Sequence, residues 1–106
     1  MISVEVYKKN GRYQKIICSG HALFADYGKD IVCASVSVLI INCFNSIEKF
    51  TDDFISSGTE NGETYLNLKD NCSKDAELLI DSLLLGLKEI KEQYGKKYLK
   101  ISVKEV

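Results

Sequence analysis

Apolar and polar residues alternate strictly at the start of the chain, a pattern typical of a β-strand with one buried face. Ile2, Val4 and Val6 occupy one side of the segment ISVEVY, and Ser3 and Glu5 occupy the other. Because successive side chains of a strand point to opposite faces, we expect the three apolar residues to face the core.

Two Asn-Gly pairs predict tight turns, since both residues tolerate the positive φ that a two-residue hairpin requires. Asn10-Gly11 separates the first strand from the segment YQKIICS, which we expect to return as a second strand. Asn61-Gly62 stands in the same way between DFISSGTE and ETYLNLK. The chain therefore contains two predicted hairpins.

Each hairpin is followed by a segment whose apolar residues recur with helical spacing. Asp30 suits the N-cap of the first helix, which we expect to run to about Phe50. Ser73 suits the N-cap of the second helix, and Gly95 suits its C-terminal end. The apolar positions that we assign to the buried faces are Val32, Val36, Leu39, Ile40, Cys43 and Ile47 in the first helix and Leu78, Leu79, Leu83, Leu87 and Ile90 in the second.

A last alternating segment, KYLKISVKEV, predicts a fifth strand. The resulting order is ββα-ββα-β, which favours an α+β fold with a mostly antiparallel sheet and two helices packed on it. The chain has no proline and no long polar linker, so we expect residues 1–106 to form a single domain.

Composition narrows the classes of function. A net charge of −1, from 14 basic and 15 acidic residues, lacks the basic surplus typical of nucleic-acid binding, so we expect no direct nucleic-acid partner. The N-terminal residues do not resemble a signal peptide, and we find no apolar run of the ~18 residues that a membrane helix requires. We therefore expect a cytoplasmic protein whose four widely spaced cysteines stay reduced.

The segment SGHALFADYGKDIVCASVSVLI holds the candidate chemistry, because it contains the only histidine, His21, and a cysteine, Cys33. If Asp30 is the N-cap, Cys33 lies in the first helical turn, where unpaired N–H groups and the helix dipole stabilise a thiolate. Lowering a thiol pKa from about 8.5 to about 7 requires roughly 2 kcal/mol. A helix N-terminus supplies ~1–2 kcal/mol, and a protonated His21 close to the sulfur would supply the remainder.

Spacing alone leaves other interpretations of these residues open. A cysteine on the apolar side of a helix is commonly a small buried hydrophobic residue. Cys18, His21 and Cys33 could supply three zinc ligands, but only one pair among them is close in sequence, so we expect no metal. Whether His21 meets Cys33 depends on the fold of the segment between them.

The motifs SGHA and DIVCASVSVL, with a stretch containing Gly28 between them, resemble the signature of the ribosomal-processing cysteine protease family, the Prp family. The resemblance extends over the whole chain. Members of this family are small homodimeric proteases that need no cofactor and remove a short N-terminal extension from a large-subunit ribosomal protein. The resemblance implies that Cys33 is the nucleophile, that His21 is the general base and that residues 22–29 form a mobile loop over the site.

Several neighbours of this dyad are candidates for supporting roles. Gly20 and Gly28 would let the chain turn, Asp30 or Ser37 would orient the histidine, and the N–H of Cys33 or Ala34 would bind the oxyanion. The supporting residues that we predict are Gly20, Gly28, Asp30, Ala34 and Ser37.

Two rival functions remain open at this stage. One is a non-catalytic, ribosome-associated binding or dimerisation module in which Cys33 is only structural. The other, more remote, is a metal-dependent hydrolase.

Overall fold

The computed structural model describes residues 1–20, 27–69, 71–94 and 96–106, together with the side chains of all of these except residues 27–30. The described elements follow the predicted ββα-ββα-β order. Their bounds are β1 (Ile2–Lys9), β2 (Arg12–Ser19), α1 (Tyr27–Phe50), β3 (Ile55–Glu60), β4 (Glu63–Leu68), α2 (Lys74–Tyr94) and β5 (Leu99–Glu105).

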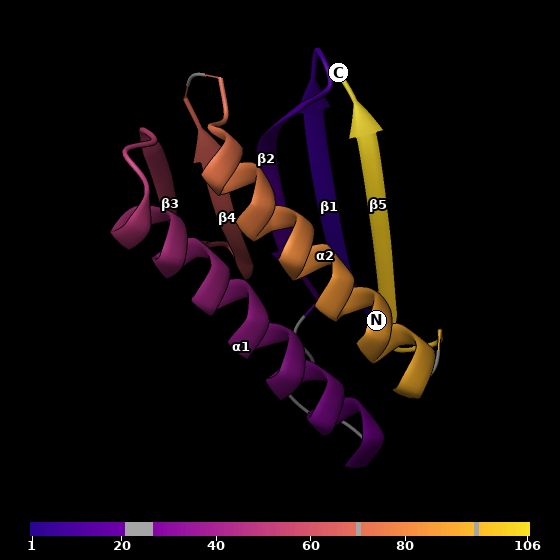
Figure 1. Ribbon diagram of the computed structural model, residues 1–106. Helices are drawn as coiled ribbons and strands as arrows, with labels where there is room; N and C mark the ends of the chain where they lie inside the picture. Colours follow the sequence, from indigo (N-terminus) through magenta and orange to yellow (C-terminus); the bar gives the residue numbers. More distant parts are fainter. Residues whose placement is uncertain (21–26, 70, 95) are drawn as a thin grey trace.

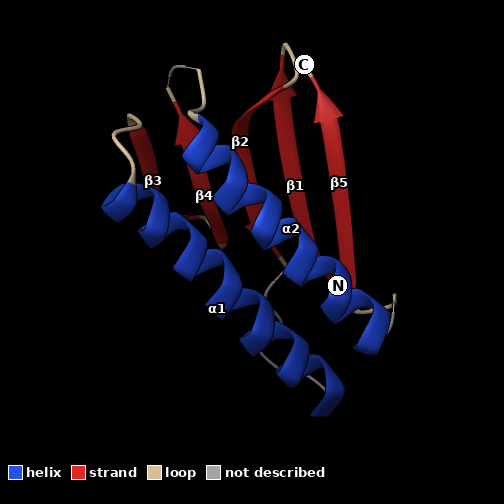
Figure 2. Cartoon of the chain, in the orientation of Figure 1, coloured by secondary structure: helices blue, strands red, loops and turns tan. Residues whose placement is uncertain are grey.

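The five strands form one sheet in the order β3-β4-β2-β1-β5, and both helices lie on the same face of it (Figures 1 and 2). Neighbouring strands run antiparallel except for β1 and β5, which pair in parallel from Ile2 opposite Leu99 to Lys8 opposite Glu105. The predicted α+β class and mostly antiparallel sheet are therefore confirmed.

Both predicted hairpins are confirmed by their backbone angles. Asn10 and Gly11 have φ of 53° and 75°, and Asn61 and Gly62 have φ of 53° and 78°. Two successive residues with positive φ define the type I′ turn, whose twist matches that of the strands it joins.

The alternation at the start of the chain gives the core its first layer. Ile2, Val4 and Val6 are fully buried beneath the helices, as predicted. From the neighbouring strands, the same side of the sheet adds Tyr13, Ile16, Cys18, Leu66, Leu68 and Leu99.

α2 begins where its predicted cap places it. The Ser73 hydroxyl accepts a hydrogen bond from the Ala76 N–H at 3.1 Å, which satisfies one of the unpaired N–H groups of the first turn. Asp53 accepts a hydrogen bond from the Ser73 N–H at 2.9 Å and so holds the cap in place. This contact explains why β3 begins at Ile55, two residues later than predicted. Gly95 lies outside the described residues.

One predicted core position of α2 is wrong. Leu78 is 67% exposed, because the helix turns a different face to the sheet. The residues on that buried face are Ala76, Ile80, Leu83, Leu84 and Leu87.

α1 is unusually apolar for a helix that packs on only one side. Its segment Ile31–Phe50 has a mean hydropathy of 1.7, which by length and composition alone is enough to cross a membrane. The expectation that the chain contains no such run is therefore wrong. In the fold, Val32, Val36, Ile40 and Ile47 of this helix belong to the core. This role accounts for about a third of the segment, and its exposed side carries the apolar Val38 and Ile41 beside the polar Asn42 and Asn45.

Candidate active site

Cys33 lies on α1, but deeper in the helix than predicted. The helix begins at Tyr27, so Cys33 is its seventh residue and belongs to the second turn. The predicted N-cap, Asp30, is instead inside the first turn. None of residues 27–29 is a proline, so their backbone can adopt helical geometry. The additional turn forms further backbone hydrogen bonds. Asp26, the acidic residue that precedes Tyr27 in the sequence, lies outside the described residues.

The earlier start changes the expected roles of two more residues. An amide this far into a helix donates to the carbonyl four residues before it, so the N–H groups of Cys33 and Ala34 have helical acceptors. The predicted oxyanion role of these two N–H groups stays a prediction. The N–H groups of residues 27–30, the first four of the described helix, have no acceptor within α1.

The predicted covering loop is also shorter than expected. Of residues 22–29, those from Tyr27 onward are helical, so Gly28 is part of the first turn rather than of a loop. His21 and residues 22–26 lie outside the described residues. The predicted dyad contact and the predicted mobility of this segment therefore stay predictions.

The Cys33 side chain is partly buried and packs against the hydrophobic core. Helical side chains lean toward the N-terminus, which places a residue of the second turn over the first. The second turn therefore lies close to the end of α1 at which the helix dipole is positive.

The other three cysteines are held as neutral thiols. All four cysteines are free and lie in the described part of the chain, and Cys33 is the only one of them that is not buried. Burial raises the pKa of Cys43 to about 12. Burial, reinforced by the neighbouring Cys33, raises the pKa of Cys18 to about 11. Burial also raises the pKa of Cys72 to about 11. Cys33 is therefore the cysteine of the four that is most accessible to a reactant.

Gly20, at the end of β2, precedes His21 and has a conformation that other residues rarely adopt. Its φ is 86°, and a Cβ atom on it would stand 2.2 Å from the carbonyl oxygen of Met1. The chain leaves β2 pressed against the start of β1, where Ser19 pairs with Ser3. A residue without a side chain is thus required at the point where the chain turns toward the predicted base.

Ser37 is partly buried and lies one turn after Cys33 on the same side of α1. It shares a helix face with the predicted nucleophile. This placement is compatible with a contact to substrate or to His21.

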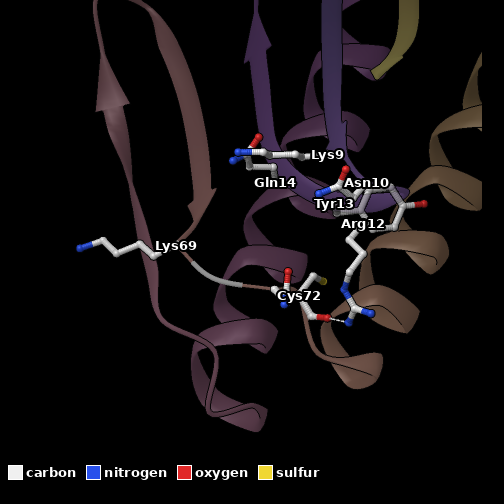
Figure 3. A pocket seen from close by; sticks show the side chains of 8 residues that line it. Lys9, Asn10, Arg12, Tyr13, Gln14, Lys69 and Cys72 are labelled. Atoms are coloured by element: carbon white, nitrogen blue, oxygen red, sulfur yellow. Dashed lines mark hydrogen bonds between the residues drawn. The ribbon is translucent and has the colours of Figure 1, made fainter. Parts of the chain in front are cut away.

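A cavity of about 590 Å³ lies at the other end of the sheet, next to the β1–β2 turn (Figure 3). Arg12 reaches from this hairpin to donate a hydrogen bond to the Cys72 carbonyl, while Lys69 points away from the other residues (Figure 3). Its one cysteine, Cys72, is buried and has a raised pKa. The thiol of this cavity is therefore less accessible than that of Cys33. Its lining residues are Lys9, Asn10, Arg12, Tyr13, Gln14, Lys69, Asn71 and Cys72.

A metal site finds no support in the part of the chain that the structure describes. No group of three histidine, cysteine or acidic side chains there is arranged to hold a metal ion. The zinc ligand set considered from the sequence includes His21, which lies outside these residues.

Comparisons of the sequence and of the fold with known proteins all identify the same family. The family described as Cysteine protease Prp matches residues 1–100. The ribosomal processing cysteine protease Prp of Staphylococcus aureus is 30% identical over 98 residues, covering 90% of this chain and 92% of the relative. A crystal structure of an essential ribosomal processing protease Prp from S. aureus with a substrate peptide aligns with a TM-score of 0.87 at 25% identity, covering 97% of this chain and 99% of that one. A second structure of that protease, with a covalently linked product peptide, aligns with a TM-score of 0.84 at 26% identity over the same shares.

Proposed function

The chain belongs to the Prp family of cysteine proteases, and we propose that it removes the N-terminal extension of a large-subunit ribosomal protein. In this proposal Cys33 is the nucleophile and His21 is the general base. The observation that carries it is the placement of Cys33, the one cysteine of the four that is not buried, one turn into the helix that follows the Gly20-His21 pair.

The proposed reaction is acyl transfer through sulfur. His21 takes the proton of the Cys33 thiol, and the thiolate attacks the carbonyl carbon of the scissile peptide bond. The C–N bond breaks as His21 returns the proton to the leaving amine, which leaves a thioester on Cys33. Water, deprotonated by His21, then attacks the thioester and releases the new carboxylate and the free thiol.

The start of α1 contributes electrostatics to this reaction. The negative charge moves from sulfur to the carbonyl oxygen and back, so donors at the positive end of the helix stabilise each anionic species. We assign the oxyanion to the unpaired N–H groups of residues 27–30, toward which the Cys33 side chain leans.

The direct test uses a synthetic peptide that spans the extension and the first residues of the mature ribosomal protein. Mass spectrometry should detect two fragments with the native protein and none with Cys33→Ala or His21→Ala. Circular dichroism of both variants shows whether the fold is retained. Cleavage by a folded Cys33→Ala variant would remove the proposed nucleophile.

We also propose that the protein is a homodimer that joins through the outer face of the helices. Between Ile31 and Ile47, α1 carries no charged residue, although Ala34, Val38 and Ile41 are exposed. A helix that is apolar on every side is normally covered on every side. α2 continues this surface with Leu78 and Leu85, because Leu39 of α1 packs close to Gly86 of α2.

Sedimentation tests the dimer. Ile41→Lys places a charge at the centre of the apolar surface and should shift the protein to the monomer at micromolar concentration. Gln93→Lys, an equivalent change at the exposed end of α2, serves as the control. A dimer that is unaffected by Ile41→Lys would place the interface elsewhere.

The proposed place of action is the cytoplasm. Four free cysteines in a chain of 106 residues are typical of a compartment that keeps thiols reduced. A thiolate nucleophile also requires such an environment, because oxidation to a disulfide would abolish its reactivity.

A further inference from the structure

Far from Cys33, the junction between α1, β3 and α2 forms a surface that the proposed reaction does not use. Residues from the end of α1 and from the start of α2 line a cavity of about 340 Å³ there. Its members are Phe50, Thr51, Asp52, Asp53, Phe54, Asn71, Ser73 and Asp75. We refer to Phe50, Asp52, Asp53, Phe54 and Asp75 as the acidic-aromatic surface.

Two phenylalanine side chains of this surface are exposed to an unusual degree. Phe50 is 74% exposed and Phe54 is 71% exposed, although both line the same cavity. A single exposed apolar side chain needs no explanation, but adjacent aromatic ones are typical of a surface that binds another chain.

Most of the charged groups around these rings are negative. Each charged residue that lines the cavity, among those the structure describes, is an aspartate. Over residues 48–54 and 71–77 the chain carries five carboxylates, namely Glu48, Asp52, Asp53, Asp75 and Glu77, against two ammonium groups, Lys49 and Lys74. The surface therefore favours a partner that is both basic and apolar.

Among these aspartates, Asp53 has a structural role, whereas Asp52 and Asp75 are exposed. Burial acts to raise the pKa of Asp53, but hydrogen bonds from Ser73 outweigh it and hold that pKa below its usual value. Asp53 therefore stays charged and holds the cap of α2. Asp52 and Asp75 are exposed and available to a partner.

α1 sets the separation between this surface and the nucleophile. Phe50 follows Cys33 by 17 residues on one continuous helix, a distance of about 25 Å at 1.5 Å per residue. Figure 1 shows the two ends of this helix at opposite extremes of the layer that covers the sheet. An extended peptide bound at Cys33 would reach the surface with about eight further residues, at ~3.3 Å each.

We propose that the acidic-aromatic surface is an exosite that binds the basic segment of the substrate downstream of the cleaved bond. This inference rests on the proposed function, in which the substrate is a ribosomal protein. A protein that binds RNA carries lysine and arginine to neutralise phosphates, so the mature part of such a substrate is basic. The exosite would select this class of substrate by charge, while Cys33 and His21 cut the extension.

The test compares three peptides. The short peptide ends two residues after the scissile bond, the long peptide continues for about twelve residues with the native lysines and arginines, and the neutral long peptide carries glutamine in their place. The protein variants are Asp52→Asn with Asp75→Asn, and separately Phe50→Ala. Glu89→Gln with Glu92→Gln removes the same charge from the far end of α2 and serves as the control.

We expect the native protein to cleave the long peptide with a kcat/KM about tenfold above that of the short and neutral peptides. Removal of two exposed ion pairs should lower that advantage about fivefold and weaken its salt dependence. Phe50→Ala should lower it too, and the control pair should keep it. Cleavage of the short peptide should be unchanged in every variant.

Different results would refute the proposed function and the exosite. Failure of the native protein to cut any of the peptides refutes the proposed function and the exosite with it. Equal cutting of long and short peptides refutes the exosite alone, as does an equal loss on both in the aspartate variant. A shift from dimer to monomer in Phe50→Ala would assign the surface to a second copy of the chain and also refute the exosite.

Discussion

Substitution of Gly20 by alanine separates two costs that the structure assigns to this position. The first is torsional, because φ at Gly20 is 86° and an L-residue in the left-handed region costs about 1–2 kcal/mol. The second is steric, because the new Cβ would stand 2.2 Å from the Met1 carbonyl oxygen, where real Cβ atoms stay beyond 3.0 Å. The backbone must therefore move by at least 0.8 Å, the difference between those distances.

The magnitude follows from adding these two costs. Forcing an extra carbon atom into a filled space costs about 1–3 kcal/mol. With the torsional cost, Gly20→Ala should destabilise the protein by about 2–5 kcal/mol. At ~4 °C or more per kcal/mol for a domain of this size, the melting temperature should fall by about 10 °C or more.

Gly11→Ala provides the matched control. Gly11 has a φ of 75°, close to that of Gly20, but a Cβ there would meet no atom within 4 Å. It therefore carries the torsional cost without the steric one, and its melting temperature should fall by only about 5 °C. The difference between the two variants isolates the contact with Met1.

Activity adds an independent measurement. His21 follows Gly20 directly, so a backbone shift of this size displaces the proposed base. A displacement of about 1 Å in a reacting group costs on the order of a hundredfold in rate. We expect kcat/KM on the peptide substrate to fall by that factor in Gly20→Ala, measured below its melting temperature, and to be unchanged in Gly11→Ala. Equal melting temperatures and full activity in both variants would refute the reasoning.

Four further predictions concern the cysteines and the α2 cap. Iodoacetamide should label Cys33 of the native protein before the three buried cysteines, as mapped by mass spectrometry, and early labelling of Cys18 would contradict the burial described above. The pKa of Cys43, raised by burial to about 12, contributes stability that is complete below the ordinary thiol pKa of about 8.5 and is lost as pH rises toward 12. Urea denaturation should therefore show declining stability above pH 9, with a shallower decline in Cys43→Val. Ser73→Ala should cost about 1 kcal/mol of unfolding free energy by loss of the cap, and an unchanged urea midpoint would dismiss that role. The lowered pKa of Asp53 adds stability above its ordinary pKa of about 3.9, so acid should destabilise the native protein more than Asp53→Asn.

Local chemistry decided the parts of the fold that the sequence predicted correctly. Each Asn-Gly pair selects one type of turn, and the strict alternation of Ile2, Val4 and Val6 admits one buried side. Ser73 is a strong cap because its hydroxyl accepts a hydrogen bond from the Ala76 N–H at the start of an amphipathic helix. These signals act over a few residues and need no knowledge of the rest of the molecule.

The start of α1 was harder, because two acidic residues four positions apart both suit an N-cap. Asp30 directly precedes the apolar stretch, yet the helix begins at Tyr27 and includes it. The position of the first helical residue depends on the backbone hydrogen bonds that an additional turn forms. The pattern of apolar and polar side chains gives no information about these bonds.

Burial of α2 and pairing of β5 depend on tertiary structure. Leu78 fits a helical apolar pattern, but the sheet covers the face that contains Ile80 and Leu87. The alternation in β5 predicts a strand without naming its neighbour, and the crossover through α2 places it parallel to β1. The exposed Phe50 and Phe54 carry no periodic signal that marks them as surface residues.

Because β1 pairs in parallel with β5, the sheet is complete only after the C-terminal strand has been synthesised. Ile2 donates its N–H to the Tyr98 carbonyl at 2.9 Å, and Gly20 rests on the residue before it. A ribosome makes β1 first, but its outer partner emerges almost a hundred residues later. Such long-range closure is a slow step in folding. A nascent chain therefore completes the sheet only after residues 98–105 have left the exit tunnel, and we expect no proteolysis by the chain before that point.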